Sequence, residues 1–142
     1  MGDDTGTRPV PRPDALTAPY WAAAARHELV IQRCARCRRW VHFPRPSCPD
    51  CGAPELAYEP VRGTGTVHTF SVVHRPFVPG FSGLVPYVTA WIDLDEQPGL
   101  RTFGNVVGCP PEDVRIGLPV RVCFTDLPGF GAIPDFRPRG ER

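Results

Sequence analysis

Two Cys-x-x-Cys pairs constrain this chain more than any other feature of its sequence. Cys34 and Cys37 form the first pair, and Cys48 and Cys51 form the second after ten intervening residues. Each pair lets two thiolates converge on one ion, and four sulfur ligands in a tetrahedron suit Zn²⁺. Four cysteines leave no open coordination position for water or substrate, so the expected role is structural. The spacing predicts a structural zinc site, with iron or two disulfides as alternatives.

The composition is that of a globular protein rich in turns. Hydrophobic residues make up 42% of the 142 residues and charged residues 22%, while 19 prolines and 14 glycines favour short strands over long helices. A formal net charge of +1 gives no general reason to expect nucleic acid or an anionic membrane. We find no secretory signal and no run of about 18 apolar residues in the sequence. We therefore expect a cytoplasmic protein, in which clustered cysteines bind metal and do not form disulfides.

The first 60 residues hold little that could fold without the metal. Residues 1–13 contain prolines and small residues that cannot bury a core, so we expect a flexible arm. A short helix is predicted over residues 17–27 with Thr17 as its N-cap, and short strands are predicted at 29–33, 40–43 and 56–59. This order is typical of a rubredoxin-like zinc ribbon, so residues 14–60 are assigned to the helix and the ribbon. His42 is interpreted as a surface histidine or a hydrogen-bond partner of the ligands.

Residues 61–142 are predicted to form a five-stranded barrel of the OB type, which makes the chain mainly β. Alternating apolar residues predict strands at 66–74, 87–94, 100–107 and 120–125, with a short last strand at 131–136. The first turn of a helix is expected at 110–115, between the third and fourth of these strands. The loop 75–86 is apolar and rich in proline and glycine. It would expose Phe77, Phe81 and Leu84 unless it folds back over the barrel mouth, and both readings stay open.

Catalytic motifs are missing from the sequence. We find no nucleophile elbow, no Walker loop and no dinucleotide-binding glycine motif. Cys109 precedes the short predicted helix, but the charges of Glu112 and Asp113 oppose a low thiol pKa. Cys123 lies in the middle of a predicted strand and is interpreted as a small core residue. We therefore predict no catalytic residue on this chain.

Several further motifs occur together and in order along the chain. They are Pro19-Tyr20-Trp21, Gln32-Arg33 before the first cysteine pair, Phe43-Pro44-Arg45, Gly63-x-Gly65-Thr66-Val67, Val73-His74-Arg75, Pro86-Tyr87-Val88, Gly104-Asn105-Val106-Val107 and Pro111 to Gly117. In this combination the chain, from about residue 15 onward, resembles the acyl-CoA-associated OB-fold/zinc-ribbon family known as domain of unknown function 35 (DUF35).

The resemblance implies an accessory subunit without activity of its own. Such proteins form hetero-oligomers with thiolase-like enzymes, including lipid-transfer-protein-type aldolases of steroid side-chain degradation, and help to form the acyl-CoA site. Related systems pair with MaoC-type enoyl-CoA hydratases, which is the first alternative. The leading hypothesis is a zinc-binding partner of a thiolase or retro-aldolase. Its predicted contacts with the partner or with CoA, whose phosphates suit arginine, are Tyr20, Trp21, Arg33, Arg38, Arg75, Phe77, Phe81 and Leu84.

Two other functions remain compatible with a ribbon and an OB barrel. Both folds bind single-stranded nucleic acid, and five arginines surround the cysteine pairs, namely Arg33, Arg36, Arg38, Arg39 and Arg45. The small net charge and the acidic residues of the barrel half argue against this function. Iron in the four-sulfur site would permit rubredoxin-like electron transfer, which a metal assay and a visible spectrum would distinguish from zinc.

Overall fold

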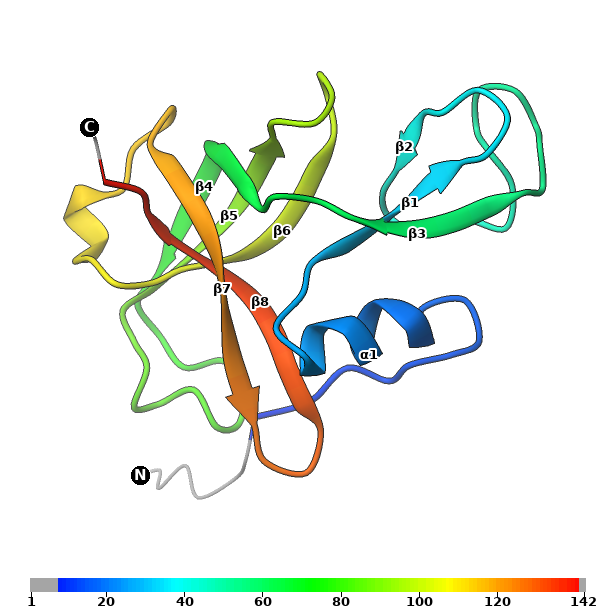
Figure 1. Ribbon diagram of the computed structural model, residues 1–142. Helices are drawn as coiled ribbons and strands as arrows, with labels where there is room; N and C mark the ends of the chain where they lie inside the picture. The colour runs from blue at the N-terminus through cyan, green and yellow to red at the C-terminus, as the bar shows by residue number, and fades with distance from the viewer. Residues whose placement is uncertain (1–7, 141–142) are drawn as a thin grey trace.

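The computed structural model describes residues 8–140, so the first half of the predicted arm lies outside the described residues. A small three-stranded sheet is followed by a closed five-stranded barrel, and a single short helix packs against both (Figure 1). The predicted architecture, a mainly β chain with a zinc ribbon and an OB barrel, is confirmed. In the described part of the chain no helix is long and apolar enough to cross a membrane.

Helix α1 (Ala18–Ala25) is prepared by the turn before it. Thr17 stands at the predicted N-cap position, but its side chain makes no cap hydrogen bond. Instead the Asp14 carboxylate accepts a hydrogen bond from the Thr17 N–H at 2.9 Å, and the Thr17 hydroxyl accepts one from the Asp14 N–H at 3.1 Å. This reciprocal pair resembles a capping box and holds the turn that precedes the helix, whose predicted N-cap position is confirmed.

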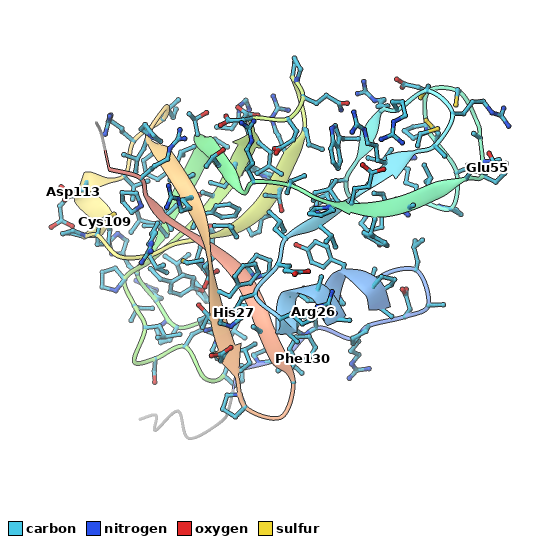
Figure 2. The ribbon with its side chains drawn as sticks, in the orientation of Figure 1. Arg26, His27, Glu55, Cys109, Asp113 and Phe130 are labelled. Atoms are coloured by element: carbon cyan, nitrogen blue, oxygen red, sulfur yellow. The ribbon has the colours of Figure 1, made fainter. Side chains whose placement is uncertain are left out.

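The end of α1 is fixed against the barrel by His27. His27 adopts a left-handed φ of 62°, and its N–H donates to the carbonyl of Ala24, which is the geometry of a Schellman helix end. The imidazole stacks on Phe124 at 5.2 Å and lies 2.9 Å from the Asp126 carboxylate. Figure 2 shows His27 near the turn that carries Phe130. The helix therefore ends on the second half of the barrel.

The ribbon consists of β1 (Val30–Cys34), β2 (Trp40–Val41) and β3 (Leu56–Pro60), in the antiparallel order β2-β1-β3. Strand β2 is shorter than the predicted strand 40–43. His42 and Phe43 leave the sheet because their rings pack on Tyr20 of α1 and on Trp91 of the barrel. The end of β2 thus joins the ribbon to the other two parts of the molecule.

The barrel consists of β4 (Thr64–Val73), β5 (Tyr87–Leu94), β6 (Arg101–Val106), β7 (Pro119–Leu127) and β8 (Gly131–Pro138). The strands close in the order β4-β5-β6-β8-β7, with β6 and β8 parallel, as expected for an OB fold. The expected helix at 110–115 is a single 3₁₀ turn, η1 (Pro111–Asp113). Gly65 is required where β4 meets β5, because a side chain there would collide with the backbone of Asp93.

One hydrophobic core runs through the helix, the near side of the ribbon and the barrel. Its buried residues include Tyr20, Leu29, Ile31, Trp40, Val67, Ile92, Val120 and Phe136. Around the cysteine pairs a second cluster contains only Cys34, Cys48 and Ala53 as buried residues. The half of the ribbon that faces the barrel is therefore held by apolar burial, and the half that carries the cysteines is not.

A polar contact also joins the ribbon to the barrel. The Gln97 side chain, in the turn between β5 and β6, accepts a hydrogen bond from the Trp40 N–H at 2.9 Å and donates one to the Trp40 carbonyl at 3.1 Å. The amide side chain thus pairs with β2 as a neighbouring strand would. The backbone N–H and carbonyl of Trp40, at the edge of the ribbon, therefore both find hydrogen-bond partners in a residue of the barrel.

Candidate metal centre and apolar pocket

The four cysteines of the two pairs meet at one point of the ribbon. Their Sγ atoms all lie within 4.8 Å of one another, with Cys34 and Cys51 separated by 3.6 Å and Cys37 and Cys48 by 3.7 Å. Sulfur ligands 2.3 Å from a tetrahedral zinc ion lie about 3.8 Å apart. Disulfide sulfurs would lie about 2.0 Å apart. The donor set therefore fits one zinc ion and does not fit two disulfides.

Backbone donors favour the thiolate form that a metal needs. The N–H groups of Arg36 and Cys37 lie 3.3 and 3.4 Å from the Sγ of Cys34. These hydrogen bonds, that of Cys37 above all, lower the pKa of the Cys34 thiol, and the N–H of Cys51 lowers the pKa of Cys48 in the same way. Each loop thus stabilises one deprotonated sulfur, whereas burial and the neighbouring cysteine side chains raise the pKa of Cys37 to about 11.

The two cysteine loops turn at equivalent positions. Gly52 follows the second pair with a φ of 78°, and Arg38 follows the first with a φ of 66°. Arg38 is held there by the carboxylate of Glu59 at 3.2 Å. Arg33 also reaches Glu59, at 3.6 Å, and stacks over Trp40 at 4.4 Å. Two of the three arginines that were predicted to contact CoA phosphates therefore already have a carboxylate partner within the chain.

The arginines near the cysteine pairs form ion pairs on the surface of the ribbon. Arg36 lies 3.5 Å from Glu55 and Arg39 lies 3.1 Å from Asp50, in addition to the two pairs with Glu59. Four of the five arginines considered for nucleic-acid binding are thus matched by acidic side chains. This pattern does not resemble the unpaired basic groove of a single-strand binder.

An apolar pocket of 510 Å³ lies where the helix, the ribbon and the barrel meet. It is lined by Thr17, Tyr20, Trp21, His42, Phe43, Pro44, Trp91, Thr102 and Phe103. Phe43 is 54% exposed and Phe103 47% exposed, whereas Tyr20 is only 8% exposed. Tyr20 therefore forms the floor of the pocket, and Phe43 and Phe103 form its rim. A recess of this size and lining suits a nonpolar group.

His42 is half-buried in the wall of this pocket, where its ring packs against Tyr20 and Phe43. Its ring stacks on Tyr20 at 5.6 Å, and its Nδ1 atom is buried without a hydrogen-bond partner among the described residues. Burial lowers the pKa of His42 to about 4, so the imidazole is neutral near pH 7. The pocket wall therefore carries no charge from this side chain.

The loop between β4 and β5 divides into a covered and an exposed part. Phe81 packs on Tyr87 at 5.2 Å, and the Arg8 guanidinium lies over its ring at 4.7 Å. Phe77 is 79% exposed and Leu84 44% exposed. The loop thus folds back at Phe81 and presents Phe77 and Leu84 to solvent, and Arg75 at its start is also exposed.

The remaining cysteines do not resemble nucleophiles. Burial raises the pKa of Cys109, and the charge of Asp113 raises it further. Burial also raises the pKa of Cys123. Cys109 and Asp113 lie beside η1, on the far side of the barrel from the ribbon (Figure 2). Within residues 8–140, Cys34, Cys37, Cys48 and Cys51 are the one group of three or more histidine, cysteine, aspartate or glutamate side chains close enough to hold a metal ion.

Two features of this region were missed by sequence reasoning. The outward residues of the 87–94 alternation include Trp91, and this periodicity could have identified the pocket wall. Gln97 lies in a turn without periodicity, and no sequence signal pointed to its contact with Trp40.

Comparison with known proteins places both halves of the chain in one family. A model described as the ChsH2 rubredoxin-like zinc ribbon domain matches residues 21–57, and one described as the ChsH2 C-terminal OB-fold domain matches residues 58–125. The structure titled Ltp2-ChsH2(DUF35) aldolase contains a chain with a TM-score of 0.82 and 37% identity, covering 91% of this chain and 98% of that one. A DUF35 protein of unknown function from Sulfolobus solfataricus shares the fold, with a TM-score of 0.61 and 12% identity over 88% of this chain and 86% of that one.

Curated relatives carry two kinds of name. A DUF35 domain-containing scaffold protein of Methanocaldococcus jannaschii is 42% identical over 70% of this chain and 69% of its own length. The probable enoyl-CoA hydratase alpha subunit of Thermomonospora curvata and the 3-oxo-4,17-pregnadiene-20-carboxyl-CoA hydratase alpha subunit of Mycobacterium tuberculosis are each 38% identical, over 92% and 90% of this chain. The chain spans only 40% of the length of these two relatives. On these matches, the chain belongs to the ChsH2/DUF35 family of zinc-ribbon and OB-fold proteins.

Proposed function

We propose that this chain is a non-catalytic, zinc-binding subunit that assembles with a thiolase-like aldolase or thiolase acting on acyl-CoA. The observation that carries the proposal is the likeness to a chain of the Ltp2-ChsH2(DUF35) aldolase, which extends over 98% of that chain at 37% identity. The likeness includes the ribbon, the helix and the barrel together. The raised thiol pKa values of Cys109 and Cys123 support placing the chemistry on the partner.

The proposed contact surface has two parts. The first is the pocket rim with Trp21, Phe43 and Phe103, and the second is the loop tip with Phe77 and Leu84. Exposed aromatic side chains grouped around a recess are typical of protein interfaces, where they supply most of the binding energy. Tyr20 and Phe81 support these surfaces from beneath, because both are packed within the chain.

The proposal includes acyl-CoA bound at the boundary between this chain and its partner. Arg75 is exposed and has no carboxylate partner among the described residues, so it is the preferred contact for a CoA phosphate. Arg33 and Arg38 are less suited because both already pair with the carboxylate of Glu59. A steroid-derived acyl group is proposed on the basis of the name of the Mycobacterium tuberculosis relative.

Co-elution tests the proposed assembly. The full chain, loaded with zinc, is mixed with a purified thiolase-like aldolase of the same organism and passed over a size-exclusion column. We expect one hetero-oligomeric peak and a gain in retro-aldol cleavage of a CoA thioester. Phe103→Asp should abolish the peak while zinc is retained, and Val10→Asp, at another exposed apolar residue, should not. Two separate peaks with no gain in activity would contradict the proposal.

A second candidate is the partner of a MaoC-type enoyl-CoA hydratase. The names of the Thermomonospora curvata and Mycobacterium tuberculosis relatives, both hydratase alpha subunits, favour it. The same column experiment with a hydratase of the organism distinguishes the two. Co-elution with the hydratase and not with the aldolase would select this second function.

A further inference from the structure

We propose that Arg121, Arg137 and Arg139 form a binding site for the phosphate groups of a small ligand. The site lies at the end of the barrel where β7 begins and β8 ends, next to the C-terminus (Figure 1). Arg121 and Arg137 face each other directly in the antiparallel pair. Arg139 is two residues further along extended chain, and its N–H bonds to the Pro119 carbonyl at 3.0 Å. Alternate residues of an extended chain point to one side, so Arg137 and Arg139 share a face, and Arg121 joins them as the cross-strand neighbour of Arg137.

These arginines surround a hollow and do not lie on a flat surface. A recess of 320 Å³ is lined by the three of them with Pro138 and Gly140. Every charged residue of this lining is therefore basic. The volume is sufficient for a small anion and too small for a folded segment of a partner, which favours a small ligand over a protein surface.

The three arginines of this site lie together around one recess without an acidic partner among the described residues, unlike the paired arginines of the ribbon. The arginines with a carboxylate within 4.0 Å are Arg26, Arg33, Arg36, Arg38, Arg39, Arg62 and Arg101. Within residues 8–140 no such partner exists for Arg121, Arg137 or Arg139. Like charges directly across a strand pair destabilise the sheet. A bound anion would remove that cost.

The number of charges favours phosphate over carboxylate. Three guanidinium groups carry three positive charges, whereas one carboxylate supplies one negative charge. A phosphate monoester carries a charge of about −1.5 to −2 and offers three acceptor oxygens to the planar N–H fork of arginine. The chemical class is therefore a phosphate or diphosphate, whether free or part of a nucleotide such as ADP or CoA.

This site is separate from the helix and the apolar pocket beside it. Gly131, at the start of β8, lies against Ala25 of the helix, whereas the arginines lie near the end of that strand. Seven strand residues span roughly 20 Å. The inference thus stands without the proposed assembly, and partner binding is not its readout.

An NMR titration of the zinc-loaded full chain tests the site. Inorganic phosphate, ADP and CoA are added at low ionic strength, and the arginine Nε–H signals report the dissociation constant. We expect saturable shifts confined to the three arginines. Arg137→Gln should weaken binding by about tenfold or more, as expected for loss of a charge-assisted hydrogen-bond pair. Arg12→Gln removes the same charge from an exposed site elsewhere and should change the constant by less than about twofold.

Each outcome decides for or against the site. Equal binding of all three probes supports it and identifies a free phosphate as sufficient, and preference for ADP or CoA supports it and identifies a nucleotide. No saturable binding, or equal losses in Arg137→Gln and Arg12→Gln, would overturn it. Tighter binding of a single-stranded oligonucleotide that Arg137→Gln abolishes would also overturn it, in favour of nucleic acid. Zinc content and circular dichroism confirm that both variants are folded.

Discussion

The ribbon and the barrel are ordered by different means. The barrel closes on itself around Ile92, Val120 and Phe136, none of which has exposed surface. Around its cysteines the ribbon buries only Cys34, Cys48 and Ala53, within three strands of at most five residues. Strands this short are marginal without further support. The comparison indicates that metal ligation takes the place of a core in the half of the ribbon that carries the cysteines, so this half and the barrel should respond differently to the same perturbation.

Removal of zinc should produce the largest difference between them. Structural zinc contributes roughly 10 kcal/mol or more to the folding of small zinc modules. We expect a strong chelator to release one zinc ion and to abolish amide protection around the two cysteine pairs, while the barrel strands keep theirs. Hydrogen exchange followed by mass spectrometry measures both regions in one sample. Cys109→Ser, a cysteine outside the cluster, should leave zinc content and ribbon protection unchanged, and equal loss of protection in ribbon and barrel would refute the distinction.

The second experiment perturbs the barrel and not the ribbon, by removing a side chain from the barrel core. Phe136→Ala removes a side chain with no exposed surface, and such a change costs about 3–5 kcal/mol. We expect a large decrease in the urea midpoint. Phe103→Ala, at a 47% exposed ring, should change the midpoint much less. If both substitutions lower the urea midpoint equally, burial of Phe136 does not supply the stability of the barrel.

The boundary between the two parts should be sensitive to pH through His42. Because burial lowers the folded-state pKa to about 4, below the usual 6.5, the unfolded chain binds an extra proton between these values. Stability is therefore fully present above pH 6.5 and falls as pH decreases toward 4, by about 2 kcal/mol between pH 7 and pH 5. Urea unfolding at both pH values, with zinc content checked, measures the loss. His42→Phe should reduce this dependence, and an unchanged slope in that variant would contradict the assignment.

A smaller effect is expected from the contact between Gln97 and the ribbon edge. Gln97→Ala removes two hydrogen bonds to Trp40, at a cost of about 1–2 kcal/mol. The change should appear as faster exchange of the Trp40 amide with little effect on the barrel. Gln97→Glu retains the acceptor for the Trp40 N–H and should lose less. If Gln97→Ala leaves that amide protected, the ribbon is held by its core contacts alone.

Much of this fold could be predicted because its signals are local. The cysteine spacing identifies four ligands that the structure brings together, and the strict alternation of Val88, Ala90, Ile92 and Leu94 gives a strand with one buried face. The predicted N-cap position, Thr17, is also the observed one, although its side chain bonds Asp14 of the preceding turn and makes no cap hydrogen bond.

The rest depends on contacts between distant parts of the chain. The burial of His42 depends on Tyr20 from the helix, and the ion pairs of Arg33 and Arg38 depend on Glu59 from another strand. Arg121 and Arg137 become neighbours only through the pairing of β7 with β8. No periodicity of the sequence reports such pairings, so the free arginines could not be distinguished from the neutralised ones.

The central claim is that the zinc-held ribbon positions the helix and the barrel as one surface for a larger enzyme. The most direct test compares Cys48→Ser with Cys109→Ser, measuring zinc content and affinity for the proposed thiolase-like partner in the same preparations. The account predicts that Cys48→Ser loses zinc and the complex together, while Cys109→Ser keeps both. Partner binding of normal affinity by zinc-free Cys48→Ser would contradict it.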